Sequence, residues 1–185
     1  ETRILKLKLD KNNMTRINKE HFTKLILSNA PIILLFISVL NEFDFNNLGF
    51  KYFSFNFTFI LIFYCGLRKN MTLGYGLIFL AGLINDAITN LPMGLSSLSY
   101  LLICVSASYL KTITLRPSLL KDLIYFLVTI LVVNSLSYIF LPIIFSIPVE
   151  YTYLLTNTFF TFLLYFVFAH LFRFYEKMIF GRFDV

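Results

Sequence analysis

This apolar sequence contains two groups of polar residues whose side chains could take part in catalysis or bind a ligand. The stretch GLINDAITNLPMG, from Gly82 to Gly94, contains Asp86, an acid that could transfer protons or hold a cation. Ser96 follows it, and a serine can act as a nucleophile when a base such as His170 lies within hydrogen-bond contact. The first questions are therefore whether Asp86 reacts or builds structure, and whether Ser96 and His170 can meet.

Long apolar segments must position these residues. The 185-residue chain is 58% hydrophobic and 14% charged, whereas about a quarter of the residues in a soluble domain are charged. Runs of about 20 apolar residues suit helices that cross a hydrocarbon core of about 30 Å. We expect an all-α fold, a polytopic membrane bundle of six transmembrane helices. The predicted segments are 25–41, 53–67, 72–88, 92–110, 121–142 and 152–172.

Basic residues are divided unequally between the two predicted sides of this bundle. All but one of the 16 Lys and Arg residues fall in the tail 1–24, the loops after the second and fourth segments and the start of the fifth, or the tail 173–185. Only Lys51 falls on the other side. The positive-inside rule then puts both termini in the cytoplasm, with residues 25–172 as the transmembrane domain. A basic tail beside a membrane is typical of attraction to anionic lipid, and we expect no nucleic-acid partner.

Cysteine labelling from outside the cell tests this orientation. We expect a cysteine introduced at Asn46 or Lys51 to react with a membrane-impermeant reagent, and one at Arg116 to be protected. The native Cys65 and Cys104 fall in apolar segments, where we expect them to pack rather than to form a disulfide or bind a metal. The reverse labelling pattern would refute the orientation.

Polar residues from four predicted segments reach one depth in the membrane. Asp86 is the only charged residue deep in any segment, and fourteen helical residues place it about 21 Å from the inner side. Asn134, Asn157, Ser96 and Ser97 reach the same level. Because a buried ionisable group is costly in lipid, Asp86 should face the bundle interior. We expect these residues to form a hydrogen-bonded cluster near the outer face.

The turn between the third and fourth segments has the residues of a tight hairpin. Asn90 tolerates the left-handed conformation that ends many helices, and Pro92 suits the first position of the next helix. We expect Asp86 to accept hydrogen bonds from the free amides after Pro92 and from Ser96 or Ser97. Replacing Asp86 with asparagine should then have a mild effect on function, and replacing it with leucine a severe one. Equal losses of function in the two variants would indicate a proton-transfer or cation-binding role.

Small residues on the third and fourth segments permit a close approach of the two helices. Gly74, Ala81 and Gly82 share one region of the third segment, and Ser97 and Cys104 lie on a stripe of the fourth. Small residues let helix backbones approach closely in lipid. We favour packing of these two helices on each other over packing on a partner.

Ser96 and His170 cannot form a catalytic pair, because they are predicted to lie at different depths in the membrane. Ser96 lies at the outer end of its segment and His170 near the cytoplasmic end of the sixth, so their depths differ by roughly 20 Å. A nucleophile and its base must be in hydrogen-bond contact. We therefore expect no enzymatic activity, and the sequence offers no catalytic, cofactor-binding or metal-binding set.

Residues 74–101 resemble the signature region of the MreD family of rod-shape-determining membrane proteins. The pattern is a glycine-rich helix, the motif G-L-x-x-D, a short turn with proline, then glycine and a helix of small residues. The matching residues are Gly82, Leu83, Asp86, Pro92 and Gly94. The family often has glycine a few residues after the aspartate, where this chain has Asn90.

The resemblance implies a non-enzymatic role in the lateral wall-elongation complex of rod-shaped bacteria, in the cytoplasmic (inner) membrane. The implied partners, besides the lipid bilayer, are an MreC-like protein and, indirectly, the MreB filament and a RodA-type glycosyltransferase with its transpeptidase. The implied fold is similar to the substrate-binding subunits of vitamin transporters.

That similarity also supports a different function, a subunit of a vitamin-type transporter that binds a small molecule near the outer face. Transport predicts a cavity of ligand size among the polar residues around Asp86, whereas a scaffold predicts a filled interior. Against transport, the first segment reads PIILLFISVL after Ala30. It lacks the repeated small residues with which such subunits dock on their motor partner.

Overall fold

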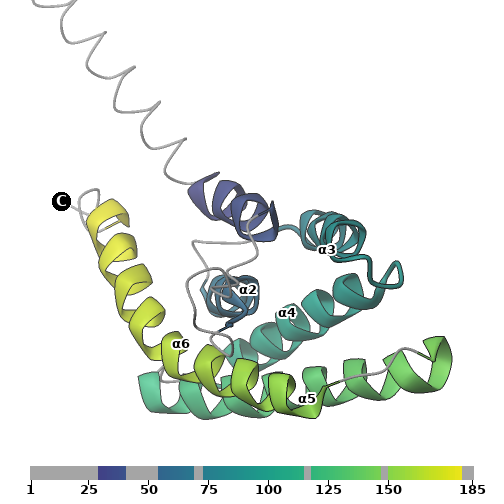
Figure 1. Cartoon of the computed structure of the whole chain (residues 1–185). Helices are drawn as coiled ribbons and strands as arrows, with labels where there is room; N and C mark the ends of the chain where they lie inside the picture. The colour runs from purple at the N-terminus through teal and green to yellow at the C-terminus, as the bar shows by residue number, and fades with distance from the viewer. Residues whose placement is uncertain (1–28, 41–53, 69–72, 115–117, 147–149, 181–185) are drawn as a thin grey trace, which may run out of the picture.

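The computed structural model describes residues 29–40, 54–68, 73–114, 118–146 and 150–180 of the chain (Figure 1). These residues are predominantly helical, which confirms the all-α class, and one helix corresponds to each of the six predicted segments. The predicted end of the sixth segment at residue 172 is wrong, because α6 continues to Phe180. The helices are Asn29–Leu40, α2 (Phe57–Leu67), α3 (Tyr75–Thr89), α4 (Leu95–Ile113), α5 (Leu119–Phe145) and α6 (Tyr151–Phe180).

Two of these helices are long and apolar enough to cross a membrane, namely α5 and the part of α6 up to Lys177. The first helix, α2 and α3 have 10–17 residues, fewer than the about 20 that a full crossing requires. The six-span arrangement therefore stays a prediction. The outer faces of α5 and α6 carry exposed large apolar side chains such as Leu120, Val128 and Leu163. Apolar surface of this extent is typical of contact with lipid or protein rather than water.

Helix α2 lies at the centre of the bundle, with the other helices around it (Figure 1). Every residue from Phe57 to Cys65 is buried, as expected of a helix that is apolar on all sides. The Phe63 ring contacts Phe126 of α5 and Tyr165 of α6, at centroid distances of 5.0 and 5.8 Å. These rings join the central helix to the two long outer ones.

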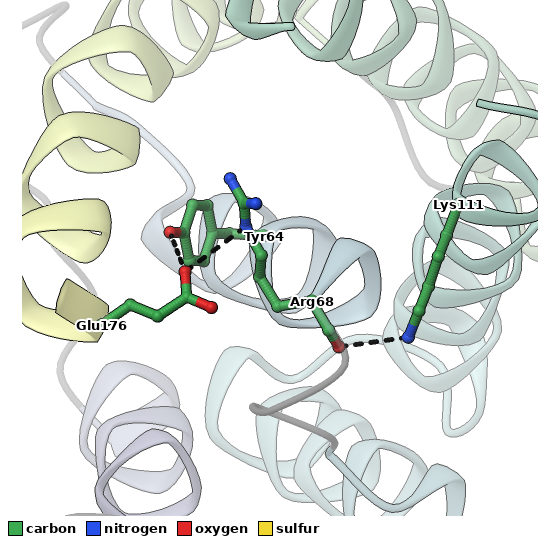
Figure 2. Close-up of polar contacts among 4 residues, drawn as sticks. All are labelled: Tyr64, Arg68, Lys111 and Glu176. Atoms are coloured by element: carbon green, nitrogen blue, oxygen red, sulfur yellow. Dashed lines mark hydrogen bonds and ion pairs between the residues drawn. The ribbon is translucent and has the colours of Figure 1, made fainter. Parts of the chain in front are cut away.

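The described ends of α2, α4 and α6 meet at one end of the bundle through a small polar cluster (Figure 2). Lys111 Nζ donates to the Arg68 carbonyl oxygen at 3.2 Å. Arg68 Nε lies 3.6 Å from Glu176 Oε2, and the Tyr64 hydroxyl donates to the same oxygen at 3.2 Å. Arg68 and Lys111 thus share one end, in agreement with the predicted division of charge. The loop positions Lys51 and Arg116 lie outside the described residues.

Candidate functional site

Asp86 is fully buried and caps the beginning of α4 from the neighbouring helix. Its Oδ2 accepts the N–H of Gly94 at 2.7 Å, and its Oδ1 accepts the N–H of Ser96 at 2.9 Å. Gly94 occupies the cap position with a φ of 99°, and it has no side chain that could satisfy the free amides of the first turn. A side chain at that position normally accepts from an amide such as that of Ser96. Asp86 supplies from α3 the acceptor that Gly94 lacks.

The backbone of Asp86 also ends α3. Its carbonyl oxygen accepts the N–H groups of Asn90 and of Leu91, the latter at 3.0 Å. Asn90 is left-handed, with φ 55° and ψ 30°, so the predicted role of this residue at the helix end is confirmed. This pattern is typical of helices that end in a left-handed residue. Asp86 thus takes part in the end of α3 through its backbone and in the beginning of α4 through its side chain.

Two details of the predicted turn are wrong. Pro92 is not the first helical residue, because the positive φ of Gly94 delays the start of α4 to Leu95, and the Pro92 carbonyl accepts the N–H of Leu95 at 3.2 Å. The serine hydroxyls do not bind Asp86 either. Ser96 Oγ accepts from Asn85 Nδ2 at 3.0 Å. Ser96 therefore reaches Asp86 through its backbone N–H.

Gly82 is where the backbones of α3 and α4 meet. A Cβ atom at Gly82 would lie 2.3 Å from Ser97 Cα and 2.5 Å from Ser97 N, so no larger residue fits without movement of the helices. Ser97 is itself fully buried, and its hydroxyl donates to the Phe79 carbonyl at 3.0 Å. The predicted packing of the two helices on each other is confirmed at this point. Gly76 does not take part, since a Cβ there meets no described atom within 4 Å.

Asn134 and Asn157 do not join Asp86, contrary to the predicted single cluster. Asn134 Nδ2 donates to Thr158 Oγ1 at 2.8 Å and links α5 to α6. Asn157 Nδ2 donates to Ser54 Oγ at 2.8 Å and links α6 to the residues before α2. The rotation of α5 and α6 about their axes therefore brings these asparagines to hydroxyl groups of neighbouring elements and not to Asp86.

These separate pairs surround a cavity of about 350 Å³. Its wall includes four asparagines, two of which the sequence singled out, together with hydroxyl groups and aromatic rings. The asparagines are Asn56, Asn85, Asn134 and Asn157. The cavity is bordered by the beginnings of α2, α4 and α6 and by the ends of α3 and α5. It therefore lies at the end of the bundle opposite Arg68 and Glu176.

Sequence reasoning missed several residues of this wall. Ser99 and Ser137 connect α4 to α5, with their hydroxyl oxygens 3.1 Å apart, and both line the cavity. Tyr100 is 2% exposed and also lines it. The signal was present in the sequence, because serine, threonine and asparagine recur in the same half of several apolar segments. Asp86 and Ser97 are absent from the described wall, although Ser96 belongs to it.

The geometry keeps the two candidate catalytic residues apart. His170 is exposed on α6, where its Nδ1 lies 3.0 Å from the Phe166 carbonyl oxygen, whereas Ser96 is buried at the cavity end of the bundle. Within the described ranges, no three His, Cys, Asp or Glu residues are grouped so that they could hold a metal ion.

Comparisons of the chain with protein-family models, curated proteins and solved structures found no match.

Proposed function

We propose that the protein is a non-enzymatic component of the lateral cell-wall elongation complex of rod-shaped bacteria, embedded in the cytoplasmic membrane as six spans. The observation that supports this function is the use of the motif residues. Gly82 lets two helices touch, Asp86 joins their ends, and Asn90 and Gly94 adopt left-handed conformations between them. The polar and small residues of the MreD-like motif form one rigid hairpin, and this hairpin presents a stable surface to a partner.

The hairpin holds apolar side chains outward at the cavity end of the bundle. Met93 is 77% exposed at the turn, and Ile88 and Leu98 are exposed on the two helices beside it. A cluster of exposed apolar residues on a rigid element is typical of a contact surface. In the six-span arrangement this surface is on the outer side of the membrane, where an MreC-like partner would bind.

Co-purification of the tagged protein from its own membrane tests this function. We expect an MreC-like chain to be recovered with the wild type, and Met93→Asp to reduce that recovery about tenfold, which corresponds to about 1.4 kcal/mol. Ile113→Asp is the matched control, since Ile113 is an exposed apolar residue at the other end of α4. Recovery of the partner at the same level with both variants would contradict this binding surface.

The cavity favours a second candidate function, that of a small-molecule-binding subunit in a vitamin-type transporter. Its volume of about 350 Å³ falls at the lower end of the range of about 300–1,000 Å³ found for ligand pockets. A scaffold predicted a filled interior at this place, so the cavity goes against that expectation and fits the one for transport. The same co-purification separates the two functions, because a transporter subunit would bring down a motor ATPase and not an MreC-like chain.

A further inference from the structure

We propose that the cavity between the helices binds an uncharged, polyhydroxylated ligand, that is, a sugar ring, either free or as the headgroup of a glycolipid. This ligand chemistry is independent of the proposed function. A component of the elongation complex could bind such a ligand as a stabilising or regulatory group, and a transporter subunit could bind it as cargo.

The described wall of the cavity contains no charged side chain. None of the described residues that line the cavity is Lys, Arg, His, Asp or Glu. The acid of the hairpin, Asp86, is fully buried, and both of its oxygens already accept backbone N–H groups. A phosphate, carboxylate or ammonium group would meet no opposite charge among the described residues of this wall, and the burial of an unpaired charge is strongly unfavourable.

The carboxamides of the wall provide donors and acceptors from several sides. Asn85 on α3 donates one N–H to Ser96, and Asn134 on α5 donates one N–H to Thr158. A carboxamide has two N–H donors and a carbonyl with two lone pairs. With respect to the described residues, each of these side chains therefore keeps a donor and an acceptor beyond this one bond. An apolar ligand would leave these groups unpaired, at a cost of about 1–3 kcal/mol each.

The distribution of polar groups favours a sugar over a flat heterocycle. The wall asparagines come from the beginning of α2 and from α3, α5 and α6, so polar groups approach the cavity from several directions. A sugar ring carries hydroxyl groups around its whole perimeter, each of which both donates and accepts. Its C–H faces are apolar and partly positive, and they suit aromatic rings such as those of Tyr100 and Tyr138 in the same wall.

Equilibrium binding to the full chain in lipid nanodiscs tests the ligand class. The probes are radiolabelled methyl glucoside, with glucosamine and glucose 6-phosphate as charged competitors, and nanodiscs that contain monoglucosyl diacylglycerol or plain diacylglycerol. We expect methyl glucoside to bind at least about tenfold more tightly than either charged analogue, a difference of about 1.4 kcal/mol. If the natural source is a glycolipid, the glucosyl lipid will raise the melting temperature of the protein and plain diacylglycerol will not.

A matched pair of variants on α5 tests the location. Ser137 lines the cavity. Ser135, two residues away on the same helix, does not line it and is exposed. We expect Ser137→Phe to fill the cavity and weaken binding at least about tenfold, and Ser135→Phe to leave it unchanged. Unchanged binding by Ser137→Phe would overturn the assignment.

The wild-type measurements decide the question even if Ser137→Phe does not fold. If neither methyl glucoside nor the glucosyl lipid binds, or if the charged analogues bind equally well, the proposal is wrong. These outcomes do not depend on which partner protein co-purifies, so the ligand and the proposed function can fail separately.

Discussion

Replacing Gly82 with alanine will separate α3 from α4 and destabilise the protein by about 1–3 kcal/mol, the usual cost of overpacking a filled interface. The added Cβ would lie 2.3 Å from the Cα and 2.5 Å from the N atom of Ser97. Both are backbone atoms, so no rotation of a side chain can relieve the contact. Gly82→Leu will be more severe, and we expect it to prevent accumulation of folded protein in the membrane.

Gly76→Ala is the matched control, because Gly76 lies on the same helix and a Cβ there meets no described atom within 4 Å. Alanine is favoured over glycine inside a helix by about 1 kcal/mol, so this variant should be as stable as the wild type or more so. The measurements are the melting temperature and the yield of folded protein after purification. Equal losses from the two alanine substitutions would show that α3 and α4 do not pack at Gly82.

The sequence was sufficient to predict the elements and the hairpin. Apolar runs indicated each helix, and an aspartate followed by Asn90 and Pro92 indicated a tight turn with free amides near the acid. These features are local, because helix ends and turns depend on residues a few positions apart. The ends of helices were less well predicted, as at Leu95, where the positive φ of Gly94 sets the start of α4.

The pairing of polar residues across the bundle could not be predicted from depth alone. Depth correctly brought Asn134, Asn157 and Ser96 to one end, where all three line the cavity. Which partner each side chain binds depends on the rotation of every helix about its axis. The sequence pattern of a helix such as α5, which also carries apolar side chains on its exposed face, defines that rotation poorly. The cavity itself arises from the space that these rotations leave, and no single segment encodes it.

Asp86 should show a graded loss of stability, with asparagine intermediate and leucine severe. The sequence alone led us to expect a mild effect from asparagine, but the structure shows that both carboxylate oxygens are used, one by Gly94 and one by Ser96. The asparagine side chain has one oxygen and one NH₂ group. One of the two backbone amides would therefore face another donor, at a cost of about 1–3 kcal/mol.

Leucine at position 86 removes both acceptors. It leaves the buried amide of Ser96 without a partner, at about 1–3 kcal/mol, and the half-buried amide of Gly94 without its protein partner. It also removes a negative charge from the positive end of the α4 dipole. Melting temperature and recovery of an MreC-like partner should both fall in the order wild type, Asp86→Asn, Asp86→Leu, at matched membrane levels. If Asp86 instead transferred protons or held a cation, the uncharged asparagine would be as damaging as leucine.

A second-site change distinguishes capping from any other structural role of Asp86. Gly94 is the cap position of α4, and a Cβ there has no described atom within 4 Å. Asparagine is a strong capping residue and tolerates positive φ better than other side chains. Any side chain at position 94 is strained by the φ of 99°, and asparagine exceeds glycine as a cap by only about a few tenths of a kcal/mol. Gly94→Asn should therefore be less harmful in the Asp86→Leu background than in the wild type, by about a few tenths of a kcal/mol. The same change in the wild type should be neutral or unfavourable, because the carboxylate already satisfies those amides. If Gly94→Asn is less harmful to stability without Asp86 than with it, the Asp86 carboxylate acts as the cap of α4.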